Sequence, residues 1–249
     1  MRPRALLAAA VLTILTSTTT PAALAAPGVA HGTDVPPGRF GFVAKLAMTK
    51  IPRPDGSTYS SYCTGALVAP AWLLTTGHCF HDANRVRVSG KTPYPTTATL
   101  GLTDEATESG IARKVTEVRQ AKESDVALLK LDTPVTTVTP MQLNRTTPKV
   151  GDQLTLAGWG SLTSTDPKPA TRMQQGTVTV AKVAPTTLGV RGAAPEITTS
   201  ACTYDSGAPY FTNDTLVALE ATGPGCPHAG IETTSRADAI ADWITKTAS

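Results

Sequence analysis

The chain is organised around nine residues that read Ala201-Cys202-Thr203-Tyr204-Asp205-Ser206-Gly207-Ala208-Pro209. A serine between a carboxylate and a glycine, with a cysteine nearby to tether the loop, is typical of a hydroxyl held for use as a nucleophile. Such a serine needs a base and an acid that orients the base. Two other stretches supply them: residues 73–79 (LLTTGHC) contain His78, and residues 123–131 (ESDVALLKL) contain Asp125. Together the three stretches predict a catalytic triad of His78, Asp125 and Ser206.

The composition is ordinary for a soluble globular protein, with 41% hydrophobic and 16% charged residues in 249. This length suits one or two compact domains. The net charge is only +3, and the 22 lysines and arginines are scattered along the sequence. A protein that binds nucleic acid or an acidic membrane surface would concentrate its basic residues. We therefore expect no nucleic acid among its partners.

Residues 1–25 have the pattern of a secretory signal peptide. Arg2 and Arg4 precede an apolar run over residues 5–15, and residues 23–25 (Ala-Leu-Ala) have the small-x-small form of a signal-peptidase site. The sequence therefore predicts a secreted, extracellular protein. The apolar run is shorter than the ~18 residues that a membrane-spanning helix needs, and no later stretch approaches that length. We expect no membrane anchor after cleavage.

The chain has four cysteines, Cys63, Cys79, Cys202 and Cys226. In an oxidising compartment an even number favours two disulfides, although four cysteines allow three pairings. Sequence proximity favours Cys63 with Cys79 and Cys202 with Cys226, each bridge contributing ~3 kcal/mol in the chain-entropy model. The competing hypothesis is a metal site of His78, Cys79 and His81. Cys-x2-Cys spacing is absent and export favours disulfides, so we expect no metal.

Short apolar or alternating runs of strand length follow one another from Phe40 onward, separated by clusters of Gly, Pro, Asn, Asp and Ser. The runs cover residues 42–47, 65–68, 72–75, 86–88, 98–100 and 127–131, then residues 153–157, 176–183, 188–191, 210–211, 216–219 and 231–234. The Thr- and Pro-rich residues 133–148 lie between the two series and predict a crossover. The pattern predicts an all-β protein with two antiparallel domains of similar size.

One helix is predicted, over about residues 235–247 at the C-terminus. Ser235 can cap it with Asp238 three residues later, and Ile240, Trp243 and Ile244 form an apolar face. We expect this face to pack against one of the β domains.

From Val29 to near the C-terminus, the residues resemble those of the chymotrypsin/trypsin-like serine proteases. Five segments resemble family motifs in the family's order: residues 63–79 the histidine segment with its disulfide, 125–131 the aspartate segment, 158–160 (Gly-Trp-Gly) the motif early in the second barrel, 202–209 the nucleophile loop, and 223–226 the substrate-binding segment. The resemblance implies two antiparallel six-stranded β-barrels with a C-terminal α-helix. The peptidase domain would be residues 29–249, with barrels at about 29–140 and 149–234. The Ala-, Thr- and Pro-rich composition resembles secreted actinobacterial members.

The resemblance also implies a function: a secreted serine endopeptidase, active as a monomer on protein or peptide substrates, open to protein inhibitors, and needing no cofactor. The backbone N–H groups of Tyr204 and Ser206 would form the oxyanion hole. Asp205 would pair with a new α-amino group at Val29, created when the signal peptide and the short propeptide remnant 26–28 are removed from this zymogen. Gly28 stands before the cut where the family usually has Lys or Arg.

Three residues depart from the family pattern. Tyr204 stands where the family has glycine, and its side chain is expected to obstruct the leaving-group side or to turn its N–H away. Ala221 replaces a serine that hydrogen-bonds the aspartate, and Thr222 replaces a tryptophan of the substrate groove. These departures motivate one alternative, a weak or inactive homologue that binds a protein partner. A second alternative is an esterase with the same triad.

The resemblance leaves the specificity of the primary pocket open. Ser200 would form the floor and Gly223 part of the wall, which favours an apolar or aromatic substrate side chain. Glu220 and Glu232 stand at wall positions that are usually uncharged, where two carboxylates would favour Lys or Arg or share one proton. The alternative is that one or both of these side chains face solvent. We expect no role for His228.

Overall fold

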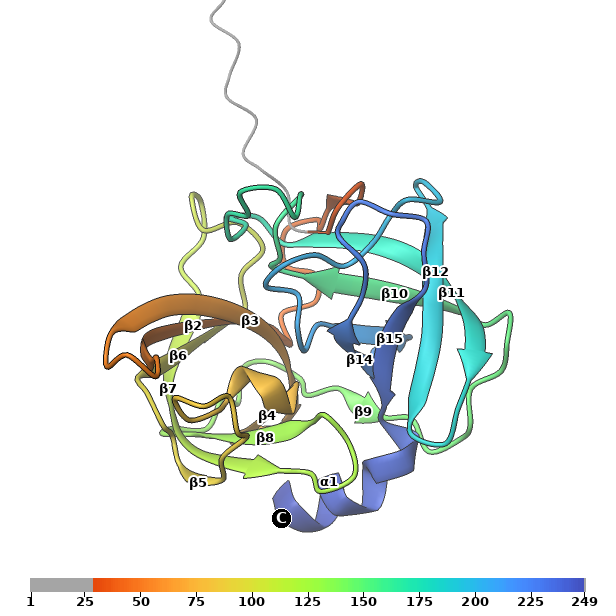
Figure 1. The fold of residues 1–249 in the computed structure, drawn as a ribbon. Helices are drawn as coiled ribbons and strands as arrows, with labels where there is room; N and C mark the ends of the chain where they lie inside the picture. The colour runs from red at the N-terminus through yellow and green to blue at the C-terminus, as the bar shows by residue number, and fades with distance from the viewer. Residues whose placement is uncertain (1–28, 249) are drawn as a thin grey trace, which may run out of the picture.

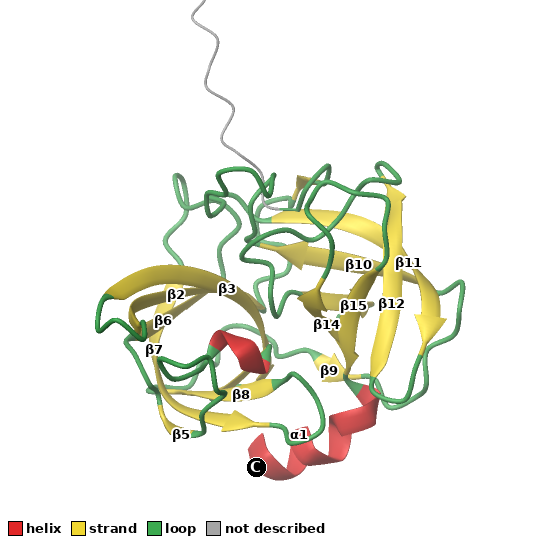
Figure 2. Cartoon of the chain, viewed as in Figure 1, coloured by secondary structure: helices red, strands yellow, loops and turns green. Residues whose placement is uncertain are grey.

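The computed structural model describes residues 29–248, so the predicted signal peptide and the remnant 26–28 lie outside the described residues. Two β-barrels lie side by side, and one short helix at the C-terminus runs beneath them (Figure 1). Figure 2 shows how little of the chain is helical. Among the described residues, no helix is long and apolar enough to cross a membrane.

The first barrel is a closed ring of six antiparallel strands, in the order β7-β6-β2-β3-β4-β8, with β8 pairing back to β7. The strands are β2 (Val43–Pro52), β3 (Thr58–Ala69), β4 (Trp72–Thr75), β6 (Thr96–Leu100), β7 (Ile111–Gln120) and β8 (Ala127–Leu131), and β5 (Gly90–Lys91) pairs with β7 outside the ring. Leu46, Leu74 and Leu128 are among the fully buried side chains that fill it.

The second barrel is also a closed ring of six antiparallel strands, in the order β11-β10-β13-β14-β15-β12, with β12 pairing back to β11. The strands are β10 (Gln153–Gly158), β11 (Gln174–Val183), β12 (Thr187–Ala194), β13 (Pro209–Thr212), β14 (Thr215–Thr222) and β15 (Glu232–Arg236), while β1 (Thr33–Asp34) pairs with β11 and β9 (Gln142–Leu143) with β14. Burial alternates along β11, as expected for a strand with one face inward. The predicted fold, a double six-stranded barrel, is confirmed.

Several predicted boundaries differ from those observed. The resemblance implies that residues 29–34 belong to the first barrel, but Thr33 and Asp34 pair with β11 of the second. Residues 86–88 form no strand, although Arg87 makes a single bridge to His81. The ten-residue strand β7 was not predicted at all.

The C-terminal helix begins later than predicted. A 3₁₀ turn covers Asp238–Ile240 and α1 covers Ala241–Ala248. Ser235 is not its cap, because it lies in β15, paired with Thr187 and Leu219. The predicted apolar face is confirmed: Ile244 is buried, and Ile240 and Trp243 pack against the same core as the first barrel.

Each half of the chain has one disulfide beside the segment that carries a candidate catalytic residue. Cys63 on β3 is bonded to Cys79, which ends the 3₁₀ turn η1 (Gly77–Cys79) after β4. Cys202 is bonded to Cys226, joining the loop before β13 to the loop after β14. These are the two pairings that sequence proximity favours, and they hold the loops that carry His78 and Ser206.

Candidate active site

Ser206 lies on a tight loop between β12 and β13. The Asp205 N–H donates to the Cys202 carbonyl at 2.9 Å and the Ala208 N–H to the Asp205 carbonyl at 2.6 Å, so two turns enclose the serine. Gly207 follows with φ of 85°, and a Cβ there would collide with the Thr75 hydroxyl and the Thr64 carbonyl. Glycine at this position lets the serine loop approach the first barrel closely.

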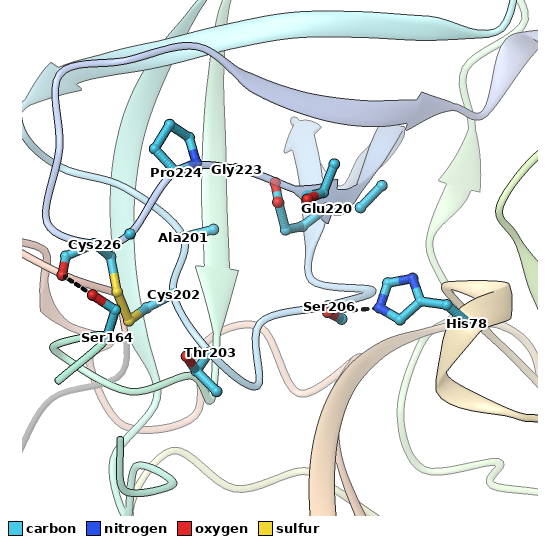
Figure 3. A pocket seen from close by; sticks show the side chains of 13 residues that line it. His78, Ser164, Ala201, Cys202, Thr203, Ser206, Glu220, Gly223, Pro224 and Cys226 are labelled. Carbon is cyan, nitrogen blue, oxygen red and sulfur yellow. Dashed lines mark hydrogen bonds between the residues drawn. A yellow bond between two sulfur atoms is a disulfide. The ribbon is translucent and has the colours of Figure 1, made fainter. Parts of the chain in front are cut away.

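His78 connects Ser206 with Asp125. Its Nε2 lies 3.0 Å from Ser206 Oγ, and its Nδ1 lies 2.6 Å from Asp125 Oδ2 (Figure 3 shows the contact with Ser206). The His78 backbone N–H also donates to Asp125 Oδ1, at 2.9 Å. A carboxylate can only accept, so Nδ1 carries the imidazole proton and Nε2 is free to accept the serine proton. The three side chains form one continuous chain of hydrogen bonds.

Asp125 stands just before β8 and is ionised in this arrangement. Burial alone would raise its pKa, but the hydrogen bond and charge of His78 and the nearby Arg87 outweigh burial and hold the pKa of Asp125 below its usual value. Arg87 Nη1 lies 3.5 Å from Asp125 Oδ1 and donates to the Ser124 carbonyl at 2.7 Å. Ala221 lines a cavity together with His78 and Asp125, and its methyl side chain offers this carboxylate no hydrogen-bond donor.

Tyr204 adopts the backbone conformation that glycine would take, with φ of 81°. Its ring packs edge-on against Tyr62, with centroids 5.7 Å apart, and its hydroxyl donates to the Pro167 carbonyl at 3.4 Å. Its own carbonyl accepts a hydrogen bond from Thr64 Oγ1 at 3.1 Å. The N–H groups of Tyr204 and Ser206 donate to no other group in the described part of the chain, so both remain available.

Asp205 points away from Ser206 into the second barrel and is fully buried. Its carboxylate accepts the Gly160 N–H at 2.8 Å and the Cys202 N–H at 3.0 Å, and a Cβ on Gly160 would collide with it. Burial, and secondarily the charge of Glu232, raise the pKa of Asp205 well above its usual value despite these two donors. Within residues 29–248, no basic side chain pairs with it.

Val29 lies fully buried near this loop, because the next residue, Ala30, exchanges hydrogen bonds of 3.0 and 3.1 Å with Ser200. In the full-length chain the nitrogen of Val29 belongs to a peptide bond and carries no charge. No ion pair between Val29 and Asp205 is present in this form of the protein.

A cavity of about 360 Å³ opens beside Ser206 and His78 (Figure 3). Its walls are His78, Ser164, Ala201, Cys202, Thr203, Ser206, Glu220, Ala221, Thr222, Gly223, Pro224, Gly225 and Cys226. Of the four predicted specificity residues, Glu220 and Gly223 line the cavity. Ser200 and Glu232 do not; both are buried behind the wall, 1% and 2% exposed.

Glu220 belongs to a buried polar cluster that the sequence did not indicate in full. The hydroxyl of Tyr210 lies 2.7 Å from Glu220 Oε2 and 2.5 Å from Glu232 Oε2. Burial and the charge of Glu232 raise the pKa of Glu220 well above its usual value. His228, expected to have no role, has Nε2 3.3 Å from Glu232 Oε1. Neither Tyr210 nor His228 lies in a sequence motif that would predict these contacts.

The competing hypothesis of a metal site of His78, Cys79 and His81, which the sequence disfavours, is contradicted by the structure. Cys79 is in a disulfide, and both ring nitrogens of His81 are engaged, Nδ1 with the Asp82 carbonyl at 2.6 Å and Nε2 with Arg85 at 3.1 Å. Across residues 29–248, no group of three or more His, Cys, Asp or Glu side chains could hold a metal ion.

The sequence is similar to a known protein family and to several named proteins. A family model described as Trypsin matches residues 29–244. Trypsin Blo t 3 from Blomia tropicalis is 27% identical over 191 residues, which is 68% of this chain and 70% of that protein. Hypodermin-B from Hypoderma lineatum is 26% identical over 210 residues, 75% of this chain and 78% of that protein. These relatives do not test the actinobacterial resemblance, which stays a prediction.

Two solved structures share the fold. The structure titled "Structure of GrC" superposes with a TM-score of 0.71 at 21% identity, covering 87% of this chain and 98% of that chain. Neuropsin, a serine protease expressed in the limbic system of mouse brain, superposes with a TM-score of 0.70 at 19% identity, covering 88% of this chain and 99% of that chain.

Proposed function

Because the chain belongs to the trypsin family of serine endopeptidases, we propose that it hydrolyses peptide bonds with Ser206 as nucleophile, His78 as general base and Asp125 as the group that orients His78. The observation that carries the proposal is the continuous hydrogen-bond chain from Asp125 Oδ2 through His78 to Ser206 Oγ, with contacts of 2.6 and 3.0 Å. Members of this family act on protein or peptide substrates.

In the proposed mechanism, His78 Nε2 takes the Ser206 proton as Oγ attacks the scissile carbonyl carbon. The imidazolium, held by Asp125, then gives the proton to the leaving amine, and an acyl-enzyme remains on Ser206. A water molecule, activated by the same nitrogen, attacks the acyl carbon and releases the acid. The unused N–H groups of Tyr204 and Ser206 would bind the oxyanion, an interaction typically worth a few kcal/mol of barrier per donor.

We further propose that the protein is a secreted monomeric zymogen that becomes active when cleavage before Val29 creates an α-amino group for Asp205. Two observations support activation by this cleavage. Asp205 is a fully buried carboxyl without a basic partner in the described chain, and Val29 is buried near the same loop. The two disulfides accord with an oxidising compartment outside the cytosol.

The test is a burst measurement with a protein that starts at Val29. The protein is mixed with a panel of chromogenic peptide esters, and Ser206→Ala is run alongside. We expect a stoichiometric burst of leaving group that the variant lacks. Turnover of the matching peptide amides then separates an endopeptidase from an esterase. If folded protein with both disulfides gives neither burst nor labelling by an organophosphorus probe, the proposal is refuted.

A binding protein without activity is the second candidate function. One observation favours it: the ring of Tyr204 packs on Tyr62 beside the nucleophile loop. The family has glycine, which has no side chain, at the position of Tyr204. Organophosphorus labelling of Ser206 decides between the two, because only a nucleophile activated by His78 reacts with the probe at a useful rate.

Arg87 is expected to act as a positioning residue for Asp125. Arg87→Gln should lower kcat/KM about twofold to fivefold, because a partly exposed ion pair of this length contributes little more than ~1 kcal/mol. Arg87→Lys keeps the charge and should restore most of the loss. The measurement is kcat/KM per titrated active site, and equal values for Arg87→Gln and the parent protein would contradict this role.

A further inference from the structure

Lys45 is a buried cation that the proposed mechanism does not use. It lies on β2 and is only 6% exposed. Its ammonium donates to Glu105 Oε2 at 2.8 Å and to the Ala170 carbonyl at 2.7 Å. Lysine is almost never buried to this extent unless its charge is paired, and taking the charge out of water costs free energy. The place of Lys45 in the structure therefore needs a separate explanation.

The ammonium of Lys45 also faces two aromatic rings. It lies 5.4 Å from the ring centroid of Tyr62 and 5.4 Å from that of Trp159. Both distances are within the ~6 Å reach of a cation–π interaction, which is stronger when the cation is removed from water. Tyr62 belongs to β3 of the first barrel, and Trp159 directly follows β10 of the second. Lys45 thus contacts one ring from each half of the chain.

Two chains of contacts lead from these rings to Tyr204. The Tyr62 ring packs edge-on against the Tyr204 ring, with centroids 5.7 Å apart. The Trp159 N–H donates to Thr64 Oγ1 at 3.3 Å, and the same hydroxyl donates to the Tyr204 carbonyl at 3.1 Å. One chain ends on the side chain of Tyr204 and the other on its backbone. Lys45 contacts the first residue of both chains.

Tyr204 needs such support because of its backbone conformation. Its φ of 81° lies in the left-handed region, which glycine enters freely and which is disfavoured about tenfold for a residue with a Cβ. A residue keeps such a conformation only where the surrounding contacts impose it. Because φ is the rotation about the N–Cα bond, this conformation also sets the direction of the Tyr204 N–H relative to Ser206, two residues later.

We propose that Lys45 is a positioning residue for the oxyanion hole. Through Tyr62 and Trp159 it holds Tyr204 in the left-handed conformation, in which the N–H of Tyr204 stays available for the oxyanion. The family has glycine at this position, which needs no such support, so Lys45 compensates for the tyrosine of this chain. The inference deepens the proposed function and rests on it only for the effect on turnover.

A merely structural role is the alternative. Lys45 joins the loop that carries Glu105, between β6 and β7, to the loop that carries Ala170, between β10 and β11. Loss of this link would weaken the fold to the same extent whether residue 204 is tyrosine or glycine. Loss of the positioning role would lower activity only when residue 204 is tyrosine. The two roles therefore predict different results when Lys45 and Tyr204 are changed together.

A double-variant cycle measures this difference. Lys45→Met keeps an unbranched side chain of similar length and removes its charge. In the protein used for the burst measurement, we expect Lys45→Met to lower kcat/KM for a peptide amide about tenfold, but less than about twofold in the Tyr204→Gly background. The reason is that glycine adopts a φ of 81° without help. Equal losses in the two backgrounds would overturn the proposal and leave Lys45 a structural role.

Two variants of Tyr62 test the route through the rings. Tyr62→Leu removes the ring that lies between Lys45 and Tyr204, and it should lower kcat/KM about threefold to tenfold. Tyr62→Phe is the matched control, because it keeps the ring and removes only the hydroxyl, and its kcat/KM should stay within about twofold of the parent value. Tyr62→Leu and Tyr62→Phe proteins of equal activity would contradict the proposed route.

Amide NMR spectra test the positioning without catalysis. The chain has five tyrosines, so a Ser206→Ala protein labelled with ¹⁵N-tyrosine gives five backbone amide signals, and Tyr204→Gly identifies the signal of Tyr204. We expect Lys45→Met to broaden or split that signal while those of Tyr94 and Tyr210 stay sharp. A Tyr204 signal that stays single and sharp would overturn the proposal even if the protein proves to be a protease. A broadened or split signal would uphold the positioning even if no acyl-enzyme is ever found.

Discussion

His78→Ala is expected to lower kcat/KM for peptide substrates about 10⁴-fold, with the fold unchanged. The loss follows from the geometry. His78 Nε2, 3.0 Å from Ser206 Oγ, is the one base within reach of the serine proton in the described structure, and its removal leaves a neutral hydroxyl as nucleophile. The measurement is kcat/KM at pH 8 for the best peptide amide, on protein whose two disulfides and thermal unfolding match those of the parent.

The double variant His78→Ala/Ser206→Ala provides the internal control. Residues that act as one unit are strongly non-additive, so the double variant should be about as slow as either single variant rather than slower by the product of the two losses. Additive losses would mean that His78 and Ser206 act separately. A His78→Ala protein that keeps more than about a tenth of the activity would contradict the proposed mechanism directly.

A strand could be predicted from the sequence where the spacing of its apolar residues matches the regular pairing of the strand in the barrel. Strand β8 is a short apolar run, and residues 127–131 were predicted with the observed bounds. Strand β7 was missed because its apolar residues Ile111, Val115 and Val118 follow the spacing of a helix face. A register shift between Val115 and Glu117 explains this spacing, since a bulge interrupts the two-residue alternation of a strand.

The sequence likewise predicts only part of the candidate site. His78, Asp125 and Ser206 each stand in a local motif, and the structure brings them within hydrogen-bonding distance. Glu220 and Glu232 could be named from sequence, but Tyr210, which joins them, could not. The contacts of Tyr210 with the two glutamates depend on how β13, β14 and β15 lie together in the barrel, and no local sequence pattern predicts that packing.

A protein that begins at Val29 is expected to be about 10² to 10³ times more active than one that keeps a few residues before Val29. The reason is the charge on Asp205. In the uncut chain burial raises the pKa of Asp205 well above its usual value, because no basic group of the described chain faces this carboxyl. A free α-amino group at Val29 would supply the cation, and leaving one member of a buried ion pair alone typically costs 3–5 kcal/mol. The pair would stabilise the nucleophile loop, two of whose turns involve Asp205.

The pH dependence of the Val29 protein distinguishes this ion pair from a merely structural effect of the extra residues. Pairing with Asp205 raises the pKa of the new amine above its free value of about 8, so the charged amine and the activity persist below the raised pKa. Both should be lost reversibly as alkaline pH removes the proton. Asp205→Asn keeps the side-chain shape but cannot form the ion pair, so it should be as weak as the extended chain and should lack the alkaline loss that belongs to the amine. An extended chain with full activity, or an Asp205→Asn protein with full activity, would show that Val29 and Asp205 do not control the nucleophile loop.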